Sequence, residues 1–377
     1  MKITEIKHVT LTDEQVHAFR MSRSFLSSNP EVDPLVIASG LFGVQAQVFS
    51  AGKLALGIRS GKNESEIDAL FAQKNGMIKT WAMRGTLHAF AAKDLPLLSA
   101  AIGFDTEVRY IRHWKNNYGV KEADSIKLLQ TLESLISITP KTKREFSAEA
   151  SDSLGEWVKP IIENGWGGAV KSLCNMGIAV FGEQRGQEVT FTRRERYIPK
   201  WKTINPENAQ DDILRRYLHT YGPASLSDFS YWLGRSVAFV KNIWERVHSE
   251  LQEVQIGGRK ACILRTDTRF IKSLGPISSQ FALLPFFDVY LLPHRKKEHL
   301  VEDMHYKKIF RAAGWISPSI IHNGRVIGVW KMERSKEKIR ITGSPFTKLD
   351  RKHKDLLREK AASIGNYFDL KISLRGF

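Results

Sequence analysis

Two glutamines, Gln45 and Gln47, stand two positions apart in an otherwise apolar segment that begins at Gly43. A neutral amide can hold a water molecule, because its carbonyl oxygen accepts hydrogen bonds and its NH2 group donates two. It cannot act as a strong general base, since it does not titrate near neutral pH. On a continuous helix the two positions differ by about 200°, so a shared site requires a helix end or extended backbone. The alternative is a structural pair, with one amide exposed and the other capping.

A predicted hairpin supplies the second set of candidate residues. Arg84 and Gly85 are expected at its turn, where Arg can reach a phosphate and Gly lets a backbone approach closely. Thr86 and His88 alternate onto one face of the following strand. Met83 could enter a base stack as an apolar wedge. The alternative is a hairpin packed on its own helices, with the arginine in a salt bridge.

Basic side chains recur near the other predicted turns, and Arg259 and Lys260 in a third hairpin are the strongest candidates for phosphate contacts. Further basic runs are Arg193-Arg194-Glu195-Arg196, Arg295-Lys296-Lys297 and Lys307-Lys308. If such residues release counterions on binding, affinity for a polyanion should fall steeply with salt.

Three histidines, His294, His299 and His305, lie within twelve residues beside acidic side chains. One interpretation is a metal site; the other is a set of exposed histidines in a charged loop. We expect no metal and no cofactor.

Turn signals and hydrophobic periodicity together predict a repeated unit of helices followed by a two-stranded hairpin. In the first unit we expect helices at 13–27, 33–44, 53–59 and 64–73, and strands at 77–83 and 86–90. In the second we expect helices at 122–138, 142–154 and 158–176, and strands at 178–183 and 188–192. In the third we expect helices at 207–221, 225–233 and 236–248, and strands at 251–256 and 260–265.

Beyond residue 270 the pattern becomes rich in strands. They are expected at 281–284, 289–292, 316–322, 326–333 and 338–342, with a hairpin turn at Asn323-Gly324 and a final helix at 350–368. The prediction is an α+β chain of three tandem winged-helix units, at 1–119, 120–204 and 205–272, followed by a β-rich C-terminal domain at 273–377 that a helix closes. The alternative is a single α+β domain whose hairpins are scaffold.

The overall composition favours a globular protein with a polyanionic partner. The 377 residues carry a net charge of +17, of which +9 falls in residues 301–377. Two cysteines are too few for a disulfide framework and fit a reducing cytosol. The longest apolar stretch, near 36–44, is far short of the roughly 20 residues of a membrane span, and no signal peptide is expected. We therefore expect a cytoplasmic, nucleoid-associated protein that does not enter membranes.

Several common catalytic motifs are absent from the sequence. It contains no Walker phosphate loop, no GxGxxG, no HExxH and no nucleophile elbow. Nucleotide hydrolysis, dinucleotide redox chemistry and serine hydrolysis are therefore disfavoured.

Four segments together resemble the AlkZ-type winged-helix DNA glycosylases, bacterial enzymes that excise alkylated purines and unhook interstrand crosslinks. Residues 41–47 (LFGVQAQ) are similar to the Gln-x-Gln motif of that family, and residues 80–88 (TWAMRGTLH) to its Met-Arg-Gly-Thr-x-His hairpin. Residues 283–292 (LLPFFDVYLL) resemble its C-terminal signature, and 323–330 (NGRVIGVW) its late hairpin. The chain departs from many relatives directly after the signature, where Pro293-His294-Arg295-Lys296-Lys297 replaces Gly, an aromatic residue and an acidic–basic pair.

The resemblance implies a concave basic channel with Gln45 and Gln47 at its centre and the Arg84 hairpin near the lesion. The implied substrate is double-stranded DNA with N7- or N3-alkylated purines, and the implied protein is a monomer. Such a base carries a positive charge and leaves without a strong acid, so neutral glutamines that jointly hold the attacking water would suffice. Most glycosylases flip the base out of the duplex, whereas a crosslinked base would require an open channel.

Two other classes of protein fit parts of the pattern. A non-enzymatic winged-helix DNA-binding transcriptional regulator would use the same basic hairpins without the glutamine pair and would give a sequence-specific footprint without base loss. An interaction scaffold would show no salt-sensitive DNA binding.

Overall fold

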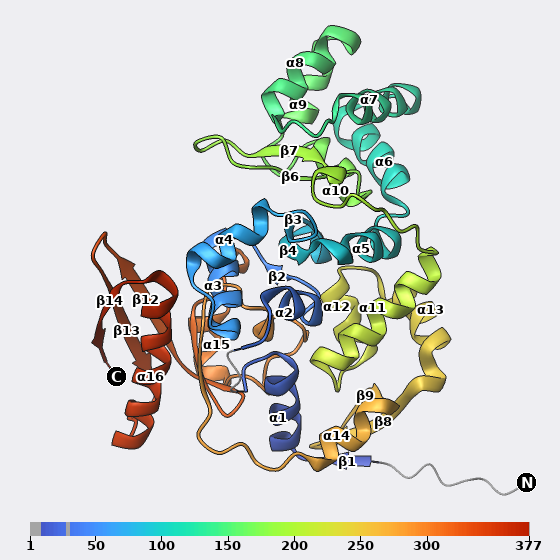
Figure 1. The fold of residues 1–377 in the computed structure, drawn as a ribbon. Coiled ribbons are helices and arrows are strands. Elements are labelled where there is room, and N and C mark those ends of the chain that lie inside the picture. The colour runs from blue at the N-terminus through green and yellow to red at the C-terminus, as the bar shows by residue number, and fades with distance from the viewer. Residues whose placement is uncertain (1–8, 28–30, 377) are drawn as a thin grey trace, which may run out of the picture. The chain divides into compact units, whose positions relative to one another are not determined.

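The computed structural model describes residues 9–27 and 31–376 of a mixed α+β chain (Figure 1). Two compact units are present, one formed by residues 1–68 with 214–377 and the other by residues 69–213. These units cross the domain boundaries expected from the sequence, since the first unit joins both ends of the chain. The division into four consecutive domains stays a prediction.

The N-terminal part of the first unit contains α1 (Asp13–Arg23), α2 (Pro34–Gly40), β2 (Val44–Gln45), α3 (Phe49–Ser60) and the start of α4 (Glu64–Ala72). Thr12 begins α1 with a capping box, in which its side chain accepts the N–H of Gln15 and the Gln15 side chain accepts the N–H of Thr12. The helix expected to run to Val44 ends at Gly40 instead. Phe42 and Gly43 have positive φ angles of 51° and 88°, which turn the chain out of the helix.

The third helix-and-hairpin module also belongs mainly to the first unit. It consists of α11 (Pro206–Tyr221), α12 (Leu226–Leu233), α13 (Val237–Val247), β8 (Leu251–Ile256), β9 (Arg259–Leu264) and α14 (Thr268–Ser273). The β8–β9 hairpin is confirmed as antiparallel. A strand that was not expected, β1 (Val9–Leu11), extends this sheet in parallel with β8. Phe19, Val254, Ile263 and neighbouring apolar side chains form its core.

The C-terminal part is a five-stranded sheet in the order β10 (Phe281–Leu284), β11 (Ser319–His322), β12 (Arg325–Arg334), β13 (Lys338–Pro345) and β14 (Lys371–Arg375). The predicted turn at Asn323-Gly324 is confirmed, with φ angles of 47° and 85°. The sheet is accompanied by α15 (Asp303–Ile309) and α16 (Arg351–Phe368), which Asp350 caps. The strand expected at 289–292 is wrong: Val289–Leu291 form a 3-10 turn, because Asp288 accepts the N–H of Tyr290. The parallel strand β14 was not expected.

The second unit holds two further hairpins. The first is β3 (Met77–Trp81) with β4 (Leu87–Ala91), and the second is β6 (Ala179–Phe181) with β7 (Thr190–Arg193); both are antiparallel, as predicted. The rest comprises α5 (Leu95–Ile102), α6 (Thr106–Tyr118), α7 (Glu122–Leu135), β5 (Lys141–Thr142), α8 (Lys143–Leu154), α9 (Lys159–Ile162) and α10 (Val170–Asn175). The single helix expected over 158–176 is broken between α9 and α10, where Gly167 and Gly168 have positive φ angles. Trp81, Phe181 and Phe191 pack in one core, with ring centroids 4.8 Å to 5.9 Å apart.

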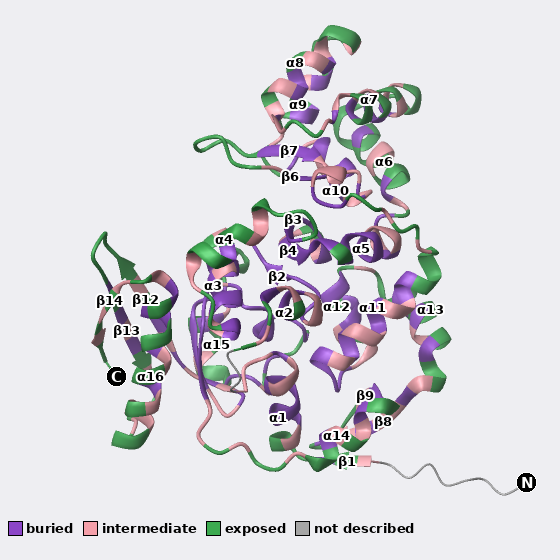
Figure 2. Cartoon of the chain, in the orientation of Figure 1, coloured by how far each residue is buried: buried purple, intermediate pink, exposed green. Residues whose placement is uncertain are grey.

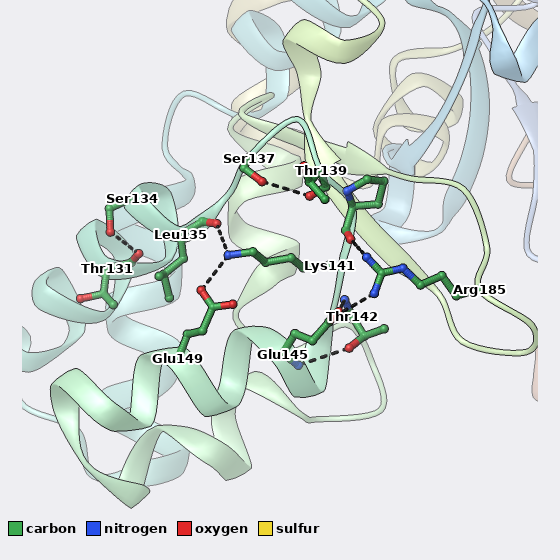
Figure 3. A network of polar contacts seen from close by, with 11 residues as sticks. Thr131, Ser134, Leu135, Ser137, Thr139, Lys141, Thr142, Glu145, Glu149 and Arg185 are labelled. Carbon is green, nitrogen blue, oxygen red and sulfur yellow. Dashed lines mark hydrogen bonds and ion pairs between the residues drawn. The ribbon is translucent and has the colours of Figure 1, made fainter.

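In the second hairpin the strands β6 and β7 are mostly buried, whereas the loop that joins them is exposed (Figure 2). Polar contacts fasten the second hairpin to α8 (Figure 3). Arg185 donates to Glu145 at 2.8 Å and to the carbonyl of Pro140, while Lys141 donates to Glu149 at 2.7 Å. The Arg185 guanidinium is therefore engaged within its own module.

Within the described ranges, no helix has the length and apolar character needed to cross a bilayer.

Candidate active site and nucleic-acid interface

Gln45 and Gln47 lie on non-helical backbone that leads into the N-terminus of α3. Gln45 ends the two-residue strand β2, and α3 begins at Phe49. The side chains are not on opposite faces of a regular helix, which meets the geometric condition set by their spacing. They differ in environment, because Gln45 is 6% exposed and Gln47 lies at the surface.

The two glutamines are connected through the backbone. The Gln45 side-chain oxygen accepts the backbone N–H of Gln47 at 2.9 Å. This contact holds the segment in one conformation and leaves the side-chain amide of Gln47 in solvent. One amide is exposed and the other satisfies local backbone, as in the structural alternative considered above, so the geometry alone assigns no catalytic role.

Helix α11 fixes the turn that precedes the glutamines. The Thr220 hydroxyl donates to the carbonyl of Gly40 and the Tyr221 hydroxyl to that of Leu41, both at 2.7 Å. The ring of Phe42 packs against Trp232 with centroids 6.2 Å apart. The segment is thus anchored by residues that lie about 180 positions away in the sequence.

Gly52 of α3 gives a test of how closely this segment is packed. A Cβ atom at Gly52 would lie 2.7 Å from the backbone oxygen of Gln45. A Gly-to-Ala change in an open helix stabilises by about 1 kcal/mol. Here the clash with backbone should reverse the sign, and we expect Gly52→Ala to lower the free energy of unfolding by about 1–2 kcal/mol.

Urea denaturation measures the stability, and hydrogen exchange measures the protection of the backbone N–H of Gln47. This protection should fall in Gly52→Ala. Ser50→Ala, at an exposed position of the same helix, is the control and should change neither. A stabilised Gly52→Ala protein with normal protection would contradict this packing.

The first hairpin of the second unit has the predicted turn. Arg84 and Gly85 have φ angles of 57° and 66°, and the N–H of Ala82 donates to the carbonyl of Thr86 at 3.0 Å. Lys171 donates to the carbonyl of Gly85 at 3.0 Å, which adds a second cation beside the tip. Gly85 is exposed and Arg84 is partly exposed.

Two of the other predicted contacts of this hairpin, Met83 and His88, face inward, whereas Thr86 is partly exposed. Met83 and His88 are each 2% exposed, and the Thr86 hydroxyl donates to the carbonyl of Met83 at 3.1 Å. Burial, with the nearby charge of Arg84, lowers the pKa of His88 to about 3, so its ring is neutral at pH 7. In this conformation the side chains of Met83 and His88 are covered by the protein itself. Arg84, Gly85 and Thr86 are the predicted contacts of this hairpin that solvent reaches, and their contact with DNA stays a prediction.

The third hairpin exposes both of its predicted phosphate contacts. Arg259 lies 3.8 Å from Asp13, and Lys260 lies 3.2 Å from Glu253. Both cations are more than half exposed, so these ion pairs are weak and leave the side chains available to a stronger anion.

The histidines of the 294–305 segment do not form the exposed set considered above. His294 is 4% exposed and its ring packs on His299 with centroids 4.8 Å apart, whereas His305 stacks on Phe346 at 3.9 Å. In the part of the chain that the structure describes, no three His, Cys, Asp or Glu side chains are arranged to hold a metal ion.

An ion pair that sequence reasoning missed links α3 to the C-terminal signature segment. Arg59 donates to both carboxylate oxygens of Asp288, at 2.7 Å and 2.8 Å, and both side chains are fully buried. Arg59 also donates to the carbonyls of Ser24 and Ala55. The only sequence signal for this pair was an aspartate inside an apolar run. Since α3 follows the glutamines directly, the pair fixes the helix on which they depend.

Comparisons with known proteins agree with one another. A profile of the family described as "DNA glycosylase AlkZ-like" matches residues 38–367. A relative from Streptomyces sahachiroi named "Interstrand DNA cross-link repair glycosylase" is 31% identical over 326 residues, which cover 84% of this chain and 87% of the relative. The solved structure "Streptomyces sahachiroi DNA glycosylase AlkZ" superposes with a TM-score of 0.84 at 27% identity and covers 97% of this chain and 100% of that chain.

Proposed function

This chain belongs to the family of AlkZ-like DNA glycosylases, and on that premise we propose that it removes N7- and N3-alkylated purines from double-stranded DNA. Membership makes it a monofunctional DNA N-glycosylase whose partner is DNA. The alkylated purine as substrate, a monomeric enzyme and a cytoplasmic, nucleoid-associated location are parts of the proposal. So is the division into three winged-helix units and a β-rich C-terminal domain, which the three helix-and-hairpin modules support.

The observation that carries the proposed chemistry is an exposed amide on a fixed backbone. Gln47 stands in solvent directly before α3, and the side chain of Gln45 holds its N–H. We assign Gln47 as the catalytic residue that accepts a hydrogen bond from the attacking water, and Gln45 as a positioning residue. This division follows from their burial, since a buried side chain cannot meet an incoming sugar without rearrangement.

The reaction balances without an acid in the active site. The C1′–N bond breaks and its electron pair passes to the alkylated base, which neutralises the positive charge on the ring. The water oxygen bonds to the electron-poor C1′, and its proton passes to solvent, which leaves an abasic sugar. Gln47 contributes orientation of the water, an effect that depends on accurate placement rather than on titration.

Arg84 is proposed to contact the DNA backbone at the tip of the first hairpin. We expect Arg84→Ala to weaken binding to duplex DNA about tenfold at low salt and to reduce the slope of log affinity against log salt by about 1. Fluorescence anisotropy across a salt series measures both quantities. Lys74→Ala, which removes one exposed charge from the same unit, is the control and should change affinity little. Equal affinity and equal slope in the two variants would exclude the contact.

The name of the Streptomyces relative suggests a larger substrate. We propose that this chain also unhooks interstrand crosslinks joined through alkylated purine nitrogens, because each such base carries the same positive charge as a methylated one. A duplex with an N7–N7 guanine crosslink and one labelled strand should yield separated strands on a denaturing gel. If the crosslink stays intact after incubation with enzyme that releases methylated bases, the function is restricted to single lesions.

A further inference from the structure

A second candidate binding site lies beside the turn of the third hairpin, within the first unit. It is a cavity of about 470 Å³ formed between α1, the start of α12, β9 and the segment that follows the C-terminal signature. This volume falls within the range typical of small-molecule sites.

A fixed cation forms one wall of the cavity. Arg20 of α1 is 7% exposed, and its guanidinium donates to the carbonyls of Gly222 and Pro223 at 3.3 Å and 2.7 Å. Both of these acceptors are neutral carbonyls. Among the described residues, no carboxylate accepts a hydrogen bond from the Arg20 guanidinium. A buried cation in this state favours an anion beside it.

Two buried histidines also line the cavity, and each has a ring nitrogen without a hydrogen-bond partner among the described residues. They are His17, which is 5% exposed, and His294, which is 4% exposed; the free atoms are Nδ1 and Nε2 respectively. His299 lies beside them and its Nε2 is equally unpartnered. Buried polar atoms are rarely left without a partner, so these nitrogens indicate a polar ligand. On a protonated ring each of them donates, which suits a ligand that accepts hydrogen bonds.

The rim of the cavity is strongly basic. Arg259, Lys260, Arg295 and Lys296 surround it, opposed by Asp13 and Asp228. Asp228 is already satisfied, because it accepts the N–H of Arg295 at 2.9 Å and the N–H and hydroxyl of Ser225 at 3.0 Å and 2.6 Å. In the described part of the chain, the only cation that Asp13 reaches is Arg259, at 3.8 Å. The balance of charge at the site is therefore positive.

We propose that this cavity binds a phosphate group, with Arg20 and the ring nitrogens of His17 and His294 at its centre and Arg295 and Lys296 at its rim. A metal ion is disfavoured by the five lysine and arginine side chains of the lining. A phosphate offers several acceptor oxygens, which suits donors that converge from different elements. The group could belong to a DNA strand or to a free nucleotide, and only the first source rests on the proposed function.

The histidines provide a readout that does not depend on enzymatic activity. Burial, with the charge of Arg20, lowers the pKa of His17 to about 4 and lowers that of His294 well below its usual value. An anion in the cavity would oppose both effects and raise these pKa values. Ring signals of the full-length protein, followed by NMR during titration with inorganic phosphate, deoxyadenosine 5′-monophosphate or undamaged duplex, should shift for His17 and His294 and not for the exposed His113.

The rim residues allow a matched pair of variants. Arg295→Gln with Lys296→Gln removes two exposed cations at the cavity, and Arg351→Gln with Lys352→Gln removes two exposed cations from α16. We expect the first double variant to bind phosphate about tenfold more weakly, as measured from the histidine shifts. The second double variant should bind phosphate with unchanged affinity.

A competition experiment between duplex DNA and the mononucleotide distinguishes the two sources of phosphate. If the ligand is a DNA phosphate, duplex DNA displaces the mononucleotide and the cavity variant binds duplex more weakly than the α16 variant. If it is a free nucleotide, the mononucleotide stays bound in the presence of duplex. Unshifted His17 and His294 signals with all three probes would overturn the proposal, whereas a failure of base release with normal shifts would overturn only the proposed function.

Discussion

Replacing Gln47 with Ala is expected to slow the release of 7-methylguanine from duplex DNA by about 100-fold, because a water molecule misplaced by about 1 Å costs that much in rate. Gln47 is exposed, so the free energy of unfolding should stay within about 0.5 kcal/mol of the wild-type value. Single-turnover base release and urea denaturation on the same preparation measure the two effects. A loss of rate without a loss of stability would mark Gln47 as part of the chemistry.

Gln45 provides the comparison for this experiment. Gln45→Ala removes the acceptor of the Gln47 N–H, so it should slow base release and also cost about 1–3 kcal/mol of stability. Gln45→Glu keeps an accepting oxygen at the same distance along the side chain and should recover part of the rate. Base release that is unchanged in both Gln47→Ala and Gln45→Ala would remove the pair from the mechanism.

Asp288→Ala is expected to lower the free energy of unfolding by about 3–5 kcal/mol, the largest effect on stability that we predict. The change leaves the guanidinium of Arg59 buried and without its two carboxylate bonds. It also removes the acceptor of the Tyr290 N–H. Urea denaturation monitored by tryptophan fluorescence would show the midpoint shift.

Two controls separate the buried pair from charge loss in general. Glu333→Ala breaks exposed ion pairs to Lys331 and Arg340 and should cost less than about 1 kcal/mol. Replacing Arg59 and Asp288 together with Leu removes both charges, and it should recover much of the stability lost in Asp288→Ala. An Asp288→Ala protein as stable as Glu333→Ala would show that the pair does not hold α3.

Local patterns in the sequence predicted local structure well. The hairpin β8–β9 and the strand β10 appear where alternation and turn residues placed them, and Asn323-Gly324 forms the expected turn. These features depend on neighbours in the sequence. The parallel pairing of β1 with β8 and the union of both chain ends in one unit depend on contacts between distant residues, which periodicity does not report.

In the candidate site, too, the sequence predicted local features and missed contacts between distant residues. The spacing of Gln45 and Gln47 required non-helical backbone, and the structure has it. The contact of Arg59 with Asp288 spans 229 positions and could not be read from either segment. The inward orientation of Met83 and His88 was missed for a similar reason, because a strand pattern gives the alternation of faces and does not say what covers each face.

We expect this glycosylase to cut the bond between a cationic purine and its sugar. The most direct test incubates the wild-type protein with two duplexes that differ only in one 7-methylguanine and analyses the products by mass spectrometry. We expect free 7-methylguanine and an abasic strand from the methylated duplex, and no free base from the unmodified one. A sequence-specific footprint on both duplexes, with every base retained, would contradict it and identify a DNA-binding regulator instead.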